Sequence, residues 1–291
     1  MDEHTAPVAQ RPARATGMSP RVVTDLLAAA VAAPSLHDSP LYAHPWRFRV
    51  RRYSHLIELR ADPARAVPYG DPSARAIHIA CGAALVNLRL AAAVAGIEPV
   101  VKLLPDPAEP VLLATVRLAG PYRALPDDER ELHAAIFGRT ASRALLSGSP
   151  VPTAVLAELA DAARVEGAIL HLLDPDETTR VRDLVRGPGR APSAGPGHRG
   201  EQLAVLSAHF GDRANWLRAG QALQRVRLTA IARGITVTPL DPLLPAPLEA
   251  AEAWLATRPH AGHEQPQMIL AIGPGLPLPP VPRHPVSRVL N

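Results

Sequence analysis

A sequence segment that occurs twice limits what this chain can fold into. Residues 82–97, Gly-Ala-Ala-Leu-Val-Asn-Leu-Arg-Leu-Ala-Ala-Ala-Val-Ala-Gly-Ile, align with residues 220–235, Gly-Gln-Ala-Leu-Gln-Arg-Val-Arg-Leu-Thr-Ala-Ile-Ala-Arg-Gly-Ile, and eight of the sixteen positions are identical. Glycine stands near both ends of each segment with an arginine between, so the match exceeds what two Ala/Leu-rich helices share by composition. We therefore predict a tandem duplication whose halves pack against each other as an internal pseudo-dimer.

The elements predicted around the two segments follow a similar order. In the first half, apolar spacing and turn residues predict helices over 20–33 and 76–95 and strands over 46–52, 56–60 and 111–118. In the second half, they predict helices over 153–165 and 214–233 and strands over 168–173, 204–209 and 267–272.

The two long helices have the clearest signals. The helix over 76–95 is apolar on nearly all sides and is expected to be buried, and Gly96 and Gly234 are expected to end the helices in the left-handed conformation. The pattern predicts an α+β fold of two tandem half-domains. Their expected extents are 18–130 and 131–291, with a disordered tail at 1–17 and a flexible Gly/Pro loop at 187–197.

Charge and composition exclude several classes of protein. The 31 basic residues include one lysine, Lys102, and the net charge is only +4 despite a pI near 9.8. The arginines are scattered along the sequence and aromatic residues make up 3%, so we expect no nucleic-acid partner. His78, Asn87 and Arg89 interrupt the apolar run 77–97 and no apolar leader precedes it, so we expect a cytoplasmic protein without a membrane span and without a membrane partner.

Metal and thiol chemistry are also not indicated. Cys81 is the single cysteine, so the chain has no disulfide framework. We expect Cys81 to be a small buried core residue. The loop segment His260-Ala-Gly-His263-Glu264 contains possible metal ligands. No third partner stands at a convincing spacing from it, so we expect no metal site.

Three segments combine residues that could form a binding site. They are Ala33-Pro-Ser-Leu-His-Asp38 with the following His44-Pro-Trp-Arg-Phe48, Phe137-Gly-Arg-Thr-Ala-Ser-Arg143, and Gly234-Ile-Thr-Val-Thr-Pro-Leu-Asp-Pro242. Taken singly, each has an ordinary interpretation: a proline that stops a helix, solvated arginines before a helix, and a turn.

Together with other phrases, these segments resemble the Acg-type branch of the nitroreductase superfamily, in which two nitroreductase-like halves are fused. The resemblance covers about residues 18–290 and includes Asp71-Pro-Ser-Ala-Arg75, Cys81-Gly-Ala-Ala-Leu85, Trp216-Leu-Arg-Ala-Gly-Gln-Ala-Leu223, Pro266-Gln-Met268 and Pro282-Arg-His-Pro-Val286. It implies a nitroreductase-like fold that binds one FMN between the halves.

The resemblance also implies roles for individual residues. Arg139 and Arg283 would contact the FMN phosphate, with Ser142 replacing the usual hydroxyl because Ala141 stands at its position. Arg143 would face the ribityl chain and the pyrimidine edge, where a cation stabilises the reduced flavin. The wall over the ring would come from Pro34, Ser35, Leu36 and Asp38, and the segment beside N5 from Pro239, Leu240 and Asp241.

The implied activity is that of an FMN-dependent oxidoreductase. NAD(P)H would deliver hydride to flavin N5, and a small-molecule acceptor such as a nitro compound, quinone or enone would then receive it, without a dedicated catalytic side chain. A flavin-sequestering stress or dormancy protein is the alternative, and an oxidase or dehydrogenase of a biosynthetic pathway would use the same site. One flavin per chain is expected, since the first half lacks an arginine motif at the matching place. A monomer with an internal pseudo-dimer is expected, and the acceptor, the choice of NADH or NADPH and further dimerisation stay open.

Overall fold

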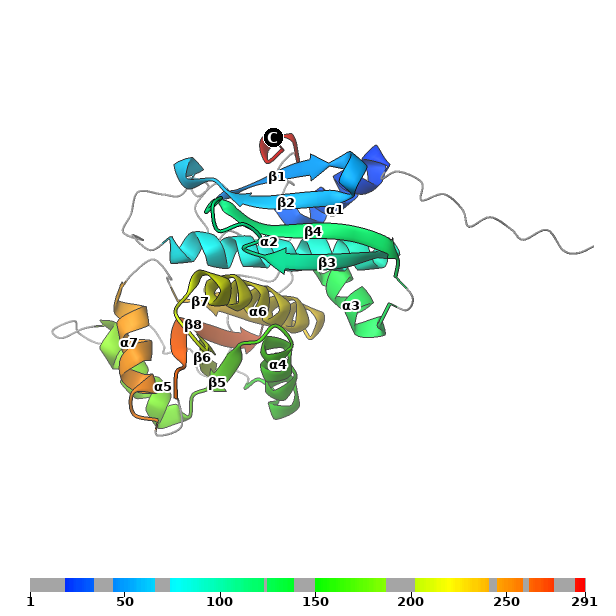
Figure 1. Cartoon of the computed structure of the whole chain (residues 1–291). Helices are drawn as coiled ribbons and strands as arrows, with labels where there is room; N and C mark the ends of the chain where they lie inside the picture. The colour runs from blue at the N-terminus through cyan, green and yellow to red at the C-terminus, as the bar shows by residue number, and fades with distance from the viewer. Residues whose placement is uncertain are drawn as a thin grey trace, which may run out of the picture.

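The computed structural model contains two four-stranded antiparallel sheets with a pair of long helices between them (Figure 1). The structure describes residues 19–33, 44–65, 74–122, 125–138, 150–186, 202–240, 245–258, 262–274 and 286–290. The expected tail at 1–17 and the expected loop at 187–197 lie outside these residues.

The first half contains one sheet and three helices. Its elements are α1 (Pro20–Val31), β1 (Trp46–Arg51), β2 (Leu56–Ala61), α2 (Arg75–Val94), β3 (Ile97–Leu103), β4 (Leu112–Pro121) and α3 (Asp127–Ala135). The strands lie in the order β1-β2-β4-β3, and every neighbouring pair is antiparallel.

The second half repeats this topology and adds two helices. Its elements are α4 (Thr153–Val165), β5 (Ile169–Leu172), α5 (Pro175–Arg186), β6 (Gln202–Ala208), α6 (Arg213–Ala232), β7 (Ile235–Pro239), α7 (Pro245–Leu255) and β8 (Gln265–Pro274). The strand order β5-β6-β8-β7 matches the first sheet strand for strand. The predicted α+β fold of two half-domains with one topology is therefore confirmed.

Local sequence signals explain where the helices begin and end. The Ser19 hydroxyl accepts a hydrogen bond from the Val22 N–H and Pro20 is the first helical residue, both ordinary helix-start features. The Asp212 side chain caps α6 in the same way, through the Asn215 N–H at 2.8 Å. Gly96 and Gly234 follow the two long helices with φ of 75° and 67°, so both predicted left-handed helix ends are confirmed.

Helices α2 and α6 pack so closely that no side chain fits between them at one point. A Cβ added to Gly82 would lie 2.2 Å from the Leu217 carbonyl oxygen, and one added to Gly220 would lie 1.9 Å from the Ile79 carbonyl oxygen. These two glycines are the first residues of the two repeated segments. Gly82 approaches Leu217, three residues before Gly220, and Gly220 approaches Ile79, three residues before Gly82. The repeat therefore forms the axis about which the two halves are related, consistent with an internal pseudo-dimer.

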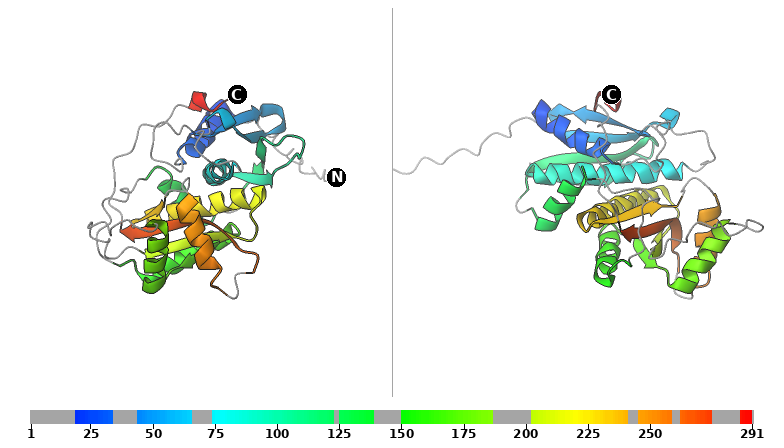
Figure 2. Two further views of the ribbon diagram at one scale, coloured as in Figure 1. Left: turned by 90° about the vertical axis from the view of Figure 1, so that its left-hand side faces the viewer. Right: turned by 180° about the vertical axis from the view of Figure 1, so that it is seen from behind.

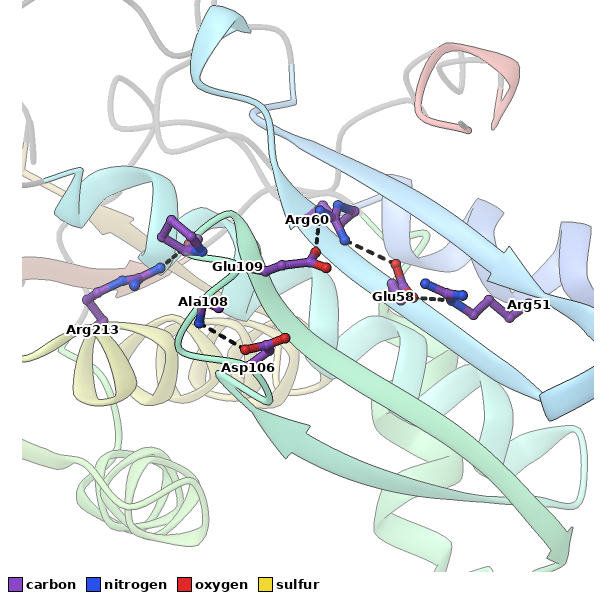
Figure 3. Close-up of polar contacts among 8 residues, drawn as sticks. Arg51, Glu58, Arg60, Asp106, Ala108, Glu109 and Arg213 are labelled. Carbon is purple, nitrogen blue, oxygen red and sulfur yellow. Dashed lines mark hydrogen bonds and ion pairs between the residues drawn. The ribbon is translucent and has the colours of Figure 1, made fainter.

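Matched residues near the helix N-termini cross between the halves in the same way. His78 and Trp216 each stand four residues before the first glycine of their repeated segment. Their rings meet edge to face with centroids 5.5 Å apart. Arg75 of α2 donates to the Gln267 carbonyl of β8, and Arg213 of α6 donates to the Pro110 carbonyl just before β4 (Figure 3). Both long helices thus begin at the same end of the molecule, where β4 and β8 also begin.

Farther along the helices, the interface is polar. The Glu166 carboxylate at the end of α4 is buried and accepts a hydrogen bond from Arg89 of α2 at 2.7 Å. The Gln224 amide donates to Asn87 Oδ1 at 2.9 Å, and the Asn87 amide donates to the Ala29 carbonyl of α1 at 3.0 Å. Polar residues of both halves are therefore paired across the contact, as buried polar groups require.

The C-terminal residues return to the first half. The Phe48 N–H of β1 donates to the Val289 carbonyl at 2.7 Å, and the Val289 side chain is buried in the first core. Residues 286–290, which follow the second half in sequence, thus bind to the edge strand β1 of the first sheet; we call them the C-terminal strap.

The halves differ in what covers the sheet face turned away from α2 and α6, which we call the outer face. In the second half, α5 follows β5, α7 follows β7, and both helices pack on the outer face, as the two views of Figure 2 show. In the first half, only the short turn Arg52–Ser54 joins β1 to β2, and residues 104–111 join β3 to β4. Hence no described helix covers the outer face of the first sheet.

One described helix is long and apolar enough to span a membrane, and it is α2. Its apolar window is 83% buried within the protein, as expected for a core helix. Cys81 lies on this helix and is fully buried, which confirms its prediction as a core residue; burial strongly raises the pKa of its thiol.

The boundary predicted between residues 130 and 131 falls inside α3. This helix packs against both α2 and α6. Helix α3, counted above with the first half, therefore contacts the long helices of both halves.

Candidate functional site

The structure describes only two of the eleven predicted cofactor-binding residues, Pro239 and Leu240. The predictions that fall outside the described residues are Pro34, Ser35, Leu36, Asp38, Arg139, Ser142, Arg143, Asp241 and Arg283. They stay predictions, and the described residues around them define the region where the site would lie.

Pro239 ends β7 and Leu240 leaves the sheet beside β8. Pro239 pairs with Leu270, and the Leu240 N–H donates to the Ile269 carbonyl at 2.8 Å. Both residues are half-buried. The Arg75–Gln267 contact lies three residues earlier on β8, so the end of β7 lies at the same end of the molecule as the N-terminus of α2.

The chain enters the other two predicted segments from positions packed against the helix pair. Ala33, the last described residue before 34–38, is buried in the first core together with Leu228 of α6. Gly138, the last before 139–143, lies against Ile231 of α6, and an added Cβ would be 3.0 Å from the Ile231 Cγ2 atom. The segment after Gly138 therefore starts from the surface of α6, and the segment after Ala33 starts from the first core.

Several buried polar atoms near these elements have unused hydrogen-bonding capacity. Among the described residues, the unpartnered oxygens are Thr236 Oγ1 on β7, Gln224 Oε1 on α6 and Gln267 Oε1 on β8, and the unpartnered nitrogens belong to Trp46, Trp254 and Arg258. A buried acceptor without a donor costs about 1–3 kcal/mol, so such atoms call for water or a ligand.

Thr236 alternates along β7 with Ile235 and Val237, which pack in the core against α6, so its hydroxyl lies on the other face of the sheet, whereas Gln224 lies between α6 and α2. These atoms therefore do not converge on one site. Of the residues expected to hold FMN, the structure describes Pro239 and Leu240, and the cations for its phosphate are all at positions outside the described residues.

A second polar cluster lies on the outer face of the second sheet. Glu264 Oε2 accepts from the Ser207 hydroxyl at 2.7 Å and lies 2.7 Å from His171 Nε2. Ser207 is fully buried, and its hydroxyl also lies 3.2 Å from His171 Nε2. The serine and the carboxylate therefore contact the same ring nitrogen, whereas a nucleophilic triad has them on opposite nitrogens, so the cluster lacks the order of a triad.

This cluster also bears on the metal prediction. Glu264, one of the weighed metal-ligand types, is engaged with the sheet, and no group of three His, Cys, Asp or Glu side chains that could hold a metal occurs among the described residues. Sequence analysis did not identify His171 and Ser207, because their proximity depends on strand pairing that no local motif encodes.

Comparisons with known proteins place the chain among nitroreductases. No family model matches the sequence. The chain is 30% identical over 328 residues to the Mycobacterium tuberculosis H37Rv protein named "Putative NAD(P)H nitroreductase Rv3131", covering 92% of this chain and 91% of that protein. It is 27% identical over 333 residues to "Putative NAD(P)H nitroreductase acg" of the same strain, covering 93% of this chain and 96% of that protein.

Among solved structures, a nitroreductase with bound FMN from Desulfitobacterium hafniense matches at 16% identity and a TM-score of 0.40, covering 52% of this chain and 94% of that chain. The family therefore rests on the sequence relatives, which match both halves of the chain. The predicted resemblance to the Acg-type branch is confirmed. This chain belongs to the nitroreductase family that includes these two M. tuberculosis proteins.

Proposed function

We propose that this protein is an FMN-dependent oxidoreductase that takes hydride from NAD(P)H and passes it to a nitro, quinone or enone acceptor. The observation that carries the proposal is the 30% identity across both halves to a protein named an NAD(P)H nitroreductase. When bound, FMN supplies the redox chemistry at its N5 atom.

In this proposal, the residues of the chain bind and orient the flavin. Arg139 and Arg283 hold the phosphate with Ser142, since a guanidinium matches phosphate oxygens in pairs. Arg143 places a positive charge beside the pyrimidine edge. Pro239, Leu240 and Asp241 line the N5 side, and the segment of Pro34, Ser35, Leu36 and Asp38 covers the ring from the first half.

The two helix-to-strand connections support one flavin per chain. Between α1 and β1, the chain has fourteen residues, 32–45, which is long enough to reach across the interface. Between α4 and β5 it has only 166–168, and these are held in place: the Glu166 carboxylate binds Arg89, Gly167 adopts φ of 79°, and Ala168 is buried. The second half therefore has no equivalent of the wall segment to cover a second ring.

Absorbance spectroscopy and anaerobic mixing test the proposal. Purified protein, or protein reconstituted with FMN, is expected to show the flavin spectrum, and NADH or NADPH is expected to bleach it. A protein that binds no FMN would exclude the proposed site. A flavoprotein that no nicotinamide donor bleaches would exclude the oxidoreductase and favour flavin sequestration.

A substitution tests the phosphate assignment separately. Arg139→Ala is expected to weaken FMN binding by about 10- to 100-fold, the scale of a charge-assisted hydrogen bond worth about 1.5–3 kcal/mol. Arg130→Ala, at an exposed position of α3, is the matched control and should leave the dissociation constant unchanged. Equal FMN affinity in the two variants would contradict the role of Arg139.

A further inference from the structure

The outer face of the first sheet gathers arginines that are scattered in the sequence. Strand β1 reads Trp-Arg-Phe-Arg-Val-Arg, so alternation buries Trp46 and Phe48 and turns Arg47, Arg49 and Arg51 to the other side. The register adds Arg60 of β2, paired with Arg47, and Arg117 of β4, paired with Leu56. Figure 1 looks onto this face, and no labelled helix lies in front of it.

The charges on these strands are strongly unequal. The face carries six cations, on Arg47, Arg49, Arg51, Arg60, Lys102 and Arg117, and two carboxylates, on Glu58 and Glu98. Asp62 and Glu109 pair with Arg47 and Arg60 at the edge of this face, so the surplus among these ten side chains is two positive charges.

Part of this charge is compensated by ion pairs. Buried Glu58 lies between Arg51 and Arg60, at 3.2 Å from the latter (Figure 3). At the edge of the face, Arg60 also pairs with Glu109 at 2.8 Å, which raises the Arg60 pKa, and Arg47 pairs with Asp62 at 2.7 Å.

Three cations are not compensated in this way. The exposed side chains of Arg49, Lys102 and Arg117 form no ion pair with any described residue. They lie on three different strands, β1, β3 and β4. The uncompensated charge is therefore spread over the width of the sheet and does not follow a single line.

The distribution of charge and aromatic residues indicates what would bind this face. A single-stranded nucleic acid needs a track of cations and several aromatic rings for stacking, but the outer face of these strands carries no aromatic residue. A flat, two-dimensional spread of cations matches a plane of anionic headgroups. Tyr53, fully exposed in the β1–β2 turn beside Arg52, and Val100, which is 39% exposed, add groups that favour a membrane–water interface.

We propose that the outer face of the first sheet, through Arg49, Lys102 and Arg117, adsorbs the protein reversibly to an anionic lipid bilayer. The attraction is electrostatic, so it is weak for each residue and decreases with salt. The proposal is independent of flavin binding, because none of these side chains is assigned to the cofactor.

Vesicle co-sedimentation tests the proposal on the full-length protein. We expect binding to vesicles of phosphatidylcholine with phosphatidylserine, loss of binding at high salt, and none to phosphatidylcholine alone. The triple variant Arg49→Gln, Lys102→Gln, Arg117→Gln is expected to bind about 100-fold more weakly, since each cation near an anionic surface contributes about 1 kcal/mol and 1.4 kcal/mol is tenfold.

A matched variant separates this face from total charge. Arg130→Gln, Arg164→Gln, Arg180→Gln removes the same number of exposed cations from α3, α4 and α5 and should retain vesicle binding within about fivefold. Both variants should keep the wild-type thermal unfolding midpoint.

Three results would overturn the proposal. They are a wild-type protein that does not bind anionic vesicles, equal weakening in the two triple variants, and binding of a single-stranded oligonucleotide but not of anionic vesicles.

Discussion

The two sheets have one topology but opposite outer faces, and the difference arises from two connections. In the second half, α5 and α7 are inserted after β5 and β7, and the face beneath them is apolar: Leu203, Val205, Ile269 and Ala271 pack against Trp254. In the first half, the matching connections are short and the face is charged. The inner faces, by contrast, are alike, since both are apolar and pack on the long helices. The repeated segments thus form similar contacts on both sides of the interface between the halves, whereas the outer faces of the two sheets differ.

The largest expected effect compares the two outer faces. Trp254→Ala removes a buried indole that packs between α7 and the second sheet, and we expect it to lower the free energy of unfolding by about 3–5 kcal/mol. Tyr53→Ala on the open first sheet removes a fully exposed ring and is expected to change it by less than about 0.5 kcal/mol. Urea denaturation measures both. Similar losses would mean that the outer faces do not differ as described.

The next effect concerns the symmetric contact of the halves. Gly220→Ala and Gly82→Ala each place a methyl group inside the van der Waals radius of a backbone carbonyl, and we expect each to destabilise by about 3 kcal/mol. Gly211→Ala is the control, because its new Cβ would lie 3.8 Å from the nearest atom, the Gln265 Cγ. A tolerated Gly220→Ala with unchanged thermal midpoint would contradict the close approach of α2 and α6.

A smaller effect tests the strap from the C-terminus. Val289→Ala removes two buried methyl groups from the first core, for an expected loss of about 1–2 kcal/mol. The exposed neighbour Leu290→Ala should cost less, because 39% of that residue is already in solvent. Thermal unfolding followed by circular dichroism compares the two, and a larger loss for Leu290→Ala would argue against the described strap.

The smallest effect is a pH dependence that involves α3. Burial lowers the pKa of His133 below the ordinary value of a histidine, because the charged imidazolium is less well solvated there. The unfolded state then binds the proton more readily, so the contribution of His133 is present above about pH 6.5 and is lost as the pH falls through the folded-state pKa. His133→Gln is expected to reduce the stability lost between neutral and mildly acidic pH by less than about 1 kcal/mol. Identical pH profiles for the wild type and His133→Gln would refute this contribution.

Sequence alone predicted the long helices and most strands, because these elements carry local signals. The helices at 76–95 and 214–233 have apolar spacing and end at glycines, and both are present with boundaries shifted by only one residue. Strands β3 and β7 were not predicted: Pro99 interrupts the first, and the second is only five residues long and ends at Pro239, where a turn was the alternative interpretation. Helices α3, α5 and α7 were missed as well, since α3 and α5 are largely polar and α7 contains prolines in its first turn.

Long-range features depend on pairing that the sequence does not encode locally. Alternation in β1 predicts that Arg47, Arg49 and Arg51 share a face, but only the register joins them to Arg117. The same holds for His171 with Glu264, which are 93 residues apart. The candidate site is loop-built, so its residues were predicted through the family resemblance and not from helical or strand periodicity.

The stoichiometry of FMN binding tests the central claim most directly: two fused halves of one topology build one flavin site. The protein is titrated with FMN at concentrations above its dissociation constant, and bound flavin is read from the absorbance spectrum. The account predicts saturation at one FMN per chain and bleaching of that flavin by NADH or NADPH. Saturation at two, or no binding, would contradict it.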